Sequence, residues 1–93
     1  LGRRWEVQEG DWRAVWIRRG NSNNFDGRWT RQGATPITAV LTMEQDGNNV
    51  RIRRRNSSDG NNCQYTGRIQ GRNASGSFTC DQGGGQWTAN IRG

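Results

Sequence analysis

Two segments that share one alternating pattern flank residues 70–73 of the chain. Cys63–Ile69 and Ala74–Cys80 each carry an apolar residue, a glycine or a cysteine at nearly every second position. Folding the chain at residues 70–73 brings both sets onto one side of an antiparallel pair, because side chains alternate between the two faces of a strand. The pairs in this register are Cys63 with Cys80, Tyr65 with Phe78, Gly67 with Gly76 and Ile69 with Ala74. The pattern predicts a hairpin with a disulfide between its two cysteines.

A disulfide would matter here because the chain has few residues with which to build a core. Only 29% of its 93 residues are hydrophobic, although five of them are Trp. A bridge that closes a loop of about 18 residues stabilises a fold by roughly 3 kcal/mol in the chain-entropy model. A disulfide also indicates an oxidising compartment, so we expect a secreted, periplasmic or cell-surface protein. The alternative is two free, buried thiols in a cytosolic protein.

Turn signals recur along the rest of the chain at a spacing of roughly 12 residues, with alternating stretches between them. The stretches begin near Trp12, Phe25, Ile37, Asn49, Asn62, Ala74 and Gln86, after a shorter one at residues 3–8. All the aromatic residues fall on one face, and no stretch has helical periodicity. We therefore expect one domain, residues 1–93, folded as a small antiparallel up-and-down β-barrel of about eight short strands. A small β-sandwich is the alternative.

Two further turns predict the register of their hairpins. Asp46-Gly47 is a two-residue signal for a type I′ turn, and Glu9-Gly10 resembles it. The pairs predicted from these turns are Met43 with Val50, Leu41 with Ile52, Ala39 with Arg54, Val7 with Trp12 and Trp5 with Ala14. In this arrangement no acidic residue of a strand points inward, and the other acids lie in or beside turns.

Two segments resemble the opening of small calycin-like barrels of the avidin and lipocalin type. Phe25–Trp29 contains the G-x-W element of these barrels, and Leu41–Val50 contains the strand that ends near Q-x-G-x-x-V. Residues 63–67, 75–80 and 86–91 are similar to uncharacterised secreted or lipoprotein domains of bacteria. The resemblance implies a barrel fold and no particular activity. Biotin binding is not implied, since the polar residues with which avidin contacts biotin have no match in this chain.

The titratable residues predict no catalytic site. The chain has no His, which is the commonest general base and metal ligand. No two carboxylates are placed to converge on one bond, as glycoside hydrolysis requires. We therefore expect a protein that is not an enzyme and that uses neither a cofactor nor a metal. No apolar run approaches the length of a membrane-spanning helix, and the pattern predicts no oligomeric state.

One end of the predicted barrel carries the loops at residues 31–36, 56–61 and 81–85, and aromatic side chains gather there with one cation. The candidate ligand-binding residues are Trp12, Trp29, Arg54, Phe78 and Trp87, with the predicted disulfide beside them. A mouth of this kind could hold a small ligand such as a sugar, an aromatic compound or a small anion. Binding of a small ligand or glycan is the leading functional prediction. Alternatively, these rings fill a narrow barrel, and Arg54 extends over them toward solvent.

The outer face of the barrel is rich in Arg. All 14 basic residues are Arg, and the net charge is +6. The candidate anion-binding residues are Arg51, Arg53, Arg55 and Arg68, and their predicted neighbours are Thr38, Val40, Thr42, Gln64 and Thr66, so that no acid neutralises them locally. The alternative functional prediction is an interaction protein that docks acidic polysaccharide, nucleic acid, an acidic protein or lipid headgroups on this face. The simpler interpretation is a solvated face that keeps the barrel soluble.

Overall fold

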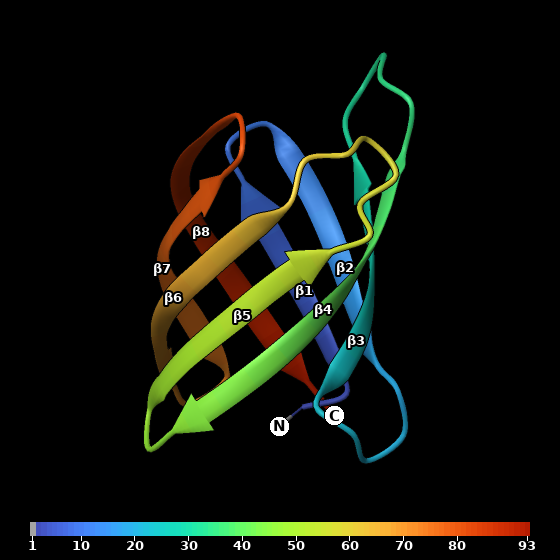
Figure 1. Cartoon of the computed structure of the whole chain (residues 1–93). Coiled ribbons are helices and arrows are strands. Elements are labelled where there is room, and N and C mark those ends of the chain that lie inside the picture. Colours follow the sequence, from blue (N-terminus) through green and yellow to red (C-terminus); the bar gives the residue numbers. More distant parts are fainter. Residues whose placement is uncertain (1) are drawn as a thin grey trace.

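Each alternating stretch of the sequence forms a strand that pairs with the next strand along the chain. The computed structural model describes residues 2–93, and the strands in this range are β1 (Arg4–Glu9), β2 (Trp12–Arg18), β3 (Asn24–Thr30), β4 (Ile37–Asp46), β5 (Asn49–Arg55), β6 (Cys63–Gln70), β7 (Asn73–Cys80) and β8 (Gly83–Arg92). All neighbouring pairs are antiparallel, and β8 pairs with β1, which closes the sheet (Figure 1). The prediction of an all-β, up-and-down barrel of eight strands is confirmed for the described chain.

The connections 10–11, 31–36, 56–62 and 81–82 lie together at one end of the barrel, which we call the loop end (Figure 1). The three predicted loops do share this end, but the last one is shorter than expected. A run of glycines is typical of a loop, yet Gly83, Gly84 and Gly85 pair with the end of β7. This pairing starts β8 at Gly83 and leaves only residues 81–82 in the turn.

The β6–β7 hairpin has the register predicted from its alternating pattern. Cys63 lies opposite Cys80, Tyr65 lies opposite Phe78, and the two cysteines form a disulfide. The bridge holds the loop end of β6 to the loop end of β7. It also indicates an oxidising environment of the extracellular type.

Two other hairpins pair two residues away from the predicted register. The prediction placed an acidic residue first in each turn, Glu9 before Gly10 and Asp46 before Gly47. In the structure the glycine is the first turn residue, with a φ of 53° at Gly10 and 59° at Gly47. Positive φ at the first turn position alone is typical of a type II′ turn, and glycine adopts it without strain. The observed pairs are Trp5 with Trp16, Val7 with Ala14, Glu9 with Trp12, Leu41 with Arg54, Met43 with Ile52, Gln45 with Val50 and Asp46 with Asn49.

The predicted core is confirmed despite these shifts, because a shift of two residues keeps every side chain on its predicted face. The fully buried aromatic side chains are Trp5, Trp16, Phe25, Trp29, Tyr65 and Trp87. Trp12 and Phe78 are half-buried against this cluster. Neighbouring aromatic rings pack with centroids 5.4 to 6.4 Å apart, within the range of favourable ring pairs. Large rings therefore compensate for the small number of apolar residues.

Candidate functional site

The loop end contains a cavity of about 210 Å³ between the strand ends and the loop at residues 56–62. Four of the predicted ligand-binding residues line it, namely Trp12, Trp29, Arg54 and Phe78. The disulfide borders it through Cys80. The structure therefore brings most of the predicted site together around one small space.

Trp87, the fifth predicted site residue, lies deeper in the barrel. It is fully buried, and its indole N–H points toward the carbonyl oxygens of Thr66 and Ser77 at 3.1 and 3.2 Å. Gly67, which faces Gly76 across β6 and β7, makes room for its ring, since a Cβ at Gly67 would lie 2.6 Å from it. Trp87 fills the middle of the barrel and does not line the cavity. The cavity therefore lies at the loop end of the barrel, and the aromatic rings that fill the barrel lie deeper.

The loop end of β8 contributes only backbone to the lining of the cavity. Gly83 and Gly84 line it, and a Cβ at Gly85 would lie 3.2 Å from the ring of Phe78. On β2 and β3 the inner positions at the same end hold Trp12 and Trp29. Large rings on β2 and β3 therefore line the space beside these glycines.

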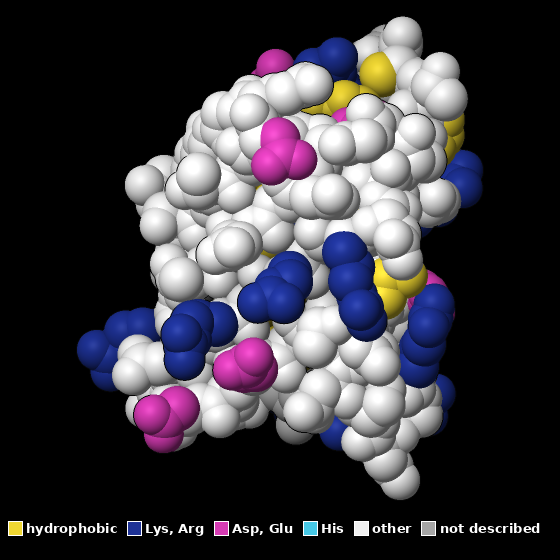
Figure 2. Space-filling model, viewed as in Figure 1, with side chains coloured by type: hydrophobic (Ala, Val, Ile, Leu, Met, Phe, Trp, Pro, Cys, Tyr) yellow, Lys and Arg dark blue, Asp and Glu magenta, His cyan; other side chains and the backbone are white. Residues whose placement is uncertain are grey.

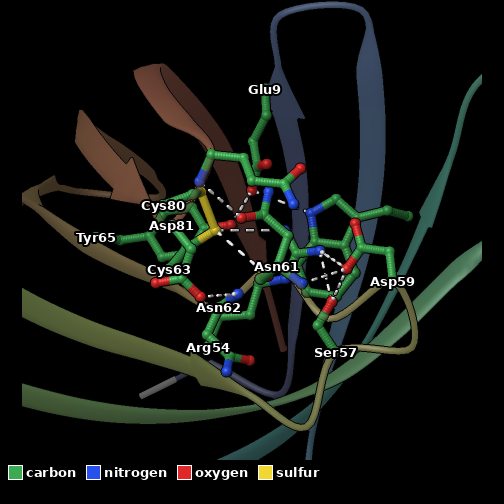
Figure 3. Close-up of a disulfide and its surroundings, with 12 residues drawn as sticks. Glu9, Arg54, Ser57, Asp59, Asn61, Asn62, Cys63, Tyr65, Cys80 and Asp81 are labelled. Carbon is green, nitrogen blue, oxygen red and sulfur yellow. Dashed lines mark hydrogen bonds and ion pairs between the residues drawn. A yellow bond between two sulfur atoms is a disulfide. The ribbon is translucent and has the colours of Figure 1, made fainter.

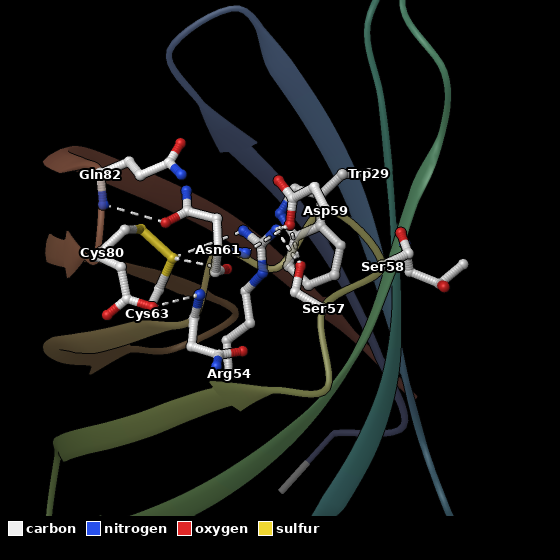
Figure 4. Close-up of polar contacts among 12 residues, drawn as sticks. Trp29, Arg54, Ser57, Ser58, Asp59, Asn61, Cys63, Cys80 and Gln82 are labelled. Atoms are coloured by element: carbon white, nitrogen blue, oxygen red, sulfur yellow. Dashed lines mark hydrogen bonds and ion pairs between the residues drawn. A yellow bond between two sulfur atoms is a disulfide. The ribbon is translucent and has the colours of Figure 1, made fainter.

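Arg54 points inward near the end of β5, as predicted, and is only 4% exposed. Its guanidinium carbon lies 4.2 Å from the centroid of the Trp29 ring. Nη2 donates to Ser57 Oγ at 2.8 Å and lies 3.5 Å from Asp59 Oδ1, while Nη1 lies 3.7 Å from Cys63 Sγ (Figure 4). Nε is buried and has no acceptor among the described residues. The head of Arg54 is held beneath the loop and does not extend into solvent, contrary to the alternative considered from the sequence.

The loop at residues 56–62 passes over the end of the barrel and is tied down by side chains (Figure 1, Figure 4). Asp59 Oδ1 accepts hydrogen bonds from the Ser57 hydroxyl and, at 3.0 Å, from the Asn61 backbone N–H. Asn61 Oδ1 accepts one from the backbone N–H of Gln82 at 3.2 Å. Burial alone would raise the pKa of Asp59, but these hydrogen bonds and the nearby guanidinium together hold that pKa below its ordinary value. The loop is therefore anchored both to β5 and to the β7–β8 turn.

Glu9 is a second buried charged residue in this region, and the sequence did not predict it. The prediction that no strand acid points inward is wrong for Glu9, which is 6% exposed. Its Oε1 accepts a hydrogen bond from Trp29 Nε1 at 3.0 Å. The same oxygen accepts one from the Tyr65 hydroxyl at 2.5 Å, and Figure 3 labels both Glu9 and Tyr65. Burial and then the charge of Glu9 raise the pKa of Tyr65, which keeps this hydroxyl a donor.

The charges around the cavity are unequally compensated. Arg54 and Asp59 form an ion pair, whereas Glu9 makes none with the described residues. The second oxygen of Glu9, Oε2, accepts no hydrogen bond from residues 2–93 and is not enclosed by protein atoms, so it faces the cavity. A ligand in this space would meet a carboxylate oxygen and aromatic rings.

The predicted anion-binding residues form a band on the outside of β5 and β6, which we call the Arg face: Arg51, Arg53, Arg55 and Arg68. Basic side chains cross the front of the molecule in Figure 2. None of the four forms an ion pair within the described chain. The observed cross-strand pairs are Arg51 with Glu44 and Thr66, Arg53 with Thr42 and Gln64, Arg55 with Val40, and Arg68 with Asn49 and Ser75. The register shift replaces Thr38 by Glu44, which lies opposite Arg51 but forms no ion pair with it.

Residues 2–93 contain no helix with the length and hydropathy that crossing a membrane would require. Within the same range, no group of three or more His, Cys, Asp or Glu side chains could hold a metal ion. No protein-family model matches the chain, and neither a curated protein nor a solved structure shows significant similarity to it.

Proposed function

We propose that this protein is a non-catalytic binding module that holds a small ligand or one unit of a glycan in the loop-end cavity. The observation that carries the proposal is the placement of Glu9 and Arg54 in a cavity beside the rings of Trp12 and Phe78. Charged residues are rarely buried, and ligand cavities combine aromatic walls with a few fixed polar groups. The volume of about 210 Å³ favours a compact ligand.

The same proposal includes the compartment and the fold family. We place the protein in an oxidising, extracytoplasmic setting, which the Cys63–Cys80 disulfide supports. We also assign the barrel to the calycin-like kind, because closure by eight antiparallel strands in up-and-down order is compatible with it.

The binding proposal is tested by ¹H–¹⁵N NMR on the oxidised protein with a panel of monosaccharides, small aromatic acids and small amines. A bound compound should shift the signals of cavity residues such as Asn61, Gly84 and the Trp12 indole. Phe78→Leu should weaken binding several-fold, because this half-buried ring lines the cavity. Ile91→Val is the matched control, since Ile91 is half-buried at the opposite end. If every compound leaves these signals unchanged, or shifts only signals outside the loop end, the proposal fails.

A second candidate function is docking of an acidic polysaccharide on the Arg face. The observation that favours it is the absence of ion pairs from Arg51, Arg53, Arg55 and Arg68 among residues 2–93. Those pairs would otherwise neutralise the field that attracts a polyanion. Arg51, Arg53 and Arg55 also line a groove of about 290 Å³.

This candidate predicts retention on heparin that falls with added salt. The triple variant Arg51→Ser/Arg53→Ser/Arg55→Ser should elute at clearly lower salt than the wild type. The control Arg3→Ser/Arg13→Ser/Arg72→Ser removes three charges from elsewhere, so both variants go from +6 to +3. Equal losses in the two variants would indicate a net-charge effect and would remove the Arg face as a specific site.

A further inference from the structure

We propose that the ligand of the loop-end cavity is a small organic cation, an ammonium group on a compact apolar body, with Glu9 as its counter-ion. This inference rests on the proposed function and narrows it to one class of ligand. It runs against the net charge of the chain, which is +6 and would suggest an anion.

The first argument is the state of Glu9. The residue is only 6% exposed, and a buried carboxylate is costly unless a cation or several hydrogen bonds compensate it. Oε1 takes two donors, but both are neutral groups, the Trp29 indole and the Tyr65 hydroxyl. Oε2 has no donor within the described chain and faces the cavity. Arg54 lies close to Tyr65 but forms no ion pair with Glu9, so a cation in the cavity can provide the ion pair that residues 2–93 do not.

The second argument is that Arg54 is already engaged. Its guanidinium pairs with Asp59, donates to Ser57 and lies over the ring of Trp29. Its Nε, which has no acceptor within residues 2–93, is enclosed by protein atoms, so a ligand in the cavity does not reach that donor. The charged residues that line the cavity are Glu9, Asp59 and Arg54, which sum to a net charge of −1. An anionic ligand would meet this net negative charge and a guanidinium that already pairs with a carboxylate.

The third argument is the wall of the cavity. Trp12 and Phe78 line it with half-buried aromatic rings, and aromatic faces attract cations. Trp12 already has the guanidinium of Arg31 at 4.5 Å from its ring centroid, so this ring does accept a cation. Arg31 itself is exposed, and solvent screens its charge from the cavity. A metal ion is a poorer candidate, because residues 2–93 hold no cluster of three acidic, His or Cys ligands.

The test uses three probes of nearly equal shape and different charge: n-butylammonium, 1-butanol and butyrate. Each is titrated into the oxidised, ¹⁵N-labelled protein, and dissociation constants are obtained from the shifts of loop-end signals. We expect n-butylammonium to bind about tenfold more tightly than 1-butanol, or better, and butyrate to bind worst, because close charge pairs contribute at least this much. The preference should decrease at high salt.

Glu9→Gln is the decisive variant, since it keeps an oxygen that can accept from Trp29 and Tyr65 while it removes the charge. Its expected effect is to abolish the preference for n-butylammonium over 1-butanol. Asp11→Asn removes a charge of the same sign from the exposed turn at residues 10–11, outside the cavity lining, and should preserve the preference. If Glu9→Gln does not fold, the three probes on the wild type still decide the question.

The outcomes separate this inference from the proposed function. Equal binding of n-butylammonium and 1-butanol, or tighter binding of butyrate, would overturn the cation inference and leave a binding module in place. Unchanged preference in Glu9→Gln would overturn Glu9 as the counter-ion. Absence of binding by all three probes and by the wider panel would remove both proposals.

Discussion

The two ends of the barrel follow the same alternation, yet their inner positions hold different chemistry. The end opposite the loop end is apolar inside: Trp5, Phe25, Met43, Val50, Ile69 and Ile91. At the loop end, β1 and β5 place Glu9 and Arg54 inside, and β8 places glycines there. The apolar end indicates that this barrel can close without buried charges, and such charges are weak contributors to stability. This contrast supports the proposal that the polar groups at the loop end serve binding.

The largest expected effect compares the two ends of one strand. Met43 and Ile37 both point inward from β4, and Met43 is fully buried whereas Ile37 is half-buried beside the cavity. Met43→Ala should lower the free energy of unfolding by about 2–5 kcal/mol, because it leaves a cavity in a packed region. Ile37→Ala should cost less than half as much. Urea denaturation measures both, and equal losses would show that the loop end is packed as tightly as its opposite.

The disulfide gives the next effect and concerns the loop end alone. Replacing both Cys63 and Cys80 by Ala should lower the free energy of unfolding by roughly 3 kcal/mol, mainly because the unfolded chain is less constrained. Hydrogen exchange of the amides at 56–62 should accelerate more than that of the turn at 47–48. A uniform acceleration at both ends would mean that the bridge stabilises the barrel as a whole.

Glu9 offers a comparison between two substitutions at one position. Glu9→Leu leaves the indole N–H of Trp29 and the hydroxyl of Tyr65 without their acceptor. A loss of about 1–3 kcal/mol in unfolding free energy is expected for orphaned buried donors. Glu9→Gln keeps an acceptor and should cost less. Thermal denaturation checks the order of the two variants, and a Leu variant more stable than Gln would contradict the hydrogen-bond network described above.

The smallest effect concerns Asp59 and pH. Its pKa is below the ordinary 3.8 in the folded protein. Its ionised form therefore contributes stability above pH 3.8, and this contribution is lost as the pH falls through the lowered folded-state pKa. Asp59→Asn should flatten this part of the acid dependence, by less than about 1 kcal/mol because the group is partly exposed. Urea midpoints measured at neutral and acidic pH test this, and parallel curves for the two proteins would refute it.

Most of the fold was readable from the sequence because strand alternation reports facing directly. The two-residue alternation of side chains along a strand predicts both the pairing of Cys63 with Cys80 and the inward direction of Arg54. Register was less secure, since Asp46-Gly47 fits either of two turn types and only the backbone shows that Gly47 is the first turn residue. Even so, a register error of two residues changes the cross-strand partners but leaves every side chain on its predicted face of the sheet.

The sequence predicted the aromatic residues and Arg54 of the candidate site but not Glu9. Glu9 has the same parity as Trp5 and Val7, and this signal was masked by the adjacent Gly10, which made Glu9 resemble a turn residue. Its partners Trp29 and Tyr65 lie 20 and 56 residues further along the chain. Such a network depends on how three strands come around the barrel to one point, and no local pattern encodes that.

The pairing of β1 with β8 has a consequence for the order of events in folding. Each of the other pairings in residues 2–93 joins strands that are neighbours in sequence, whereas this seam joins Arg4 to Arg92. Local hairpins form at low loop-closure entropy, and a contact across the whole chain carries the highest. We therefore expect the seam to form after the transition state. Val7→Ala, which weakens the seam, should then speed unfolding while refolding keeps its rate, and stopped-flow chevron plots would show a slowed refolding limb if the seam formed early. If refolding keeps its rate, the barrel is a row of hairpins that closes into a ring only at its final step.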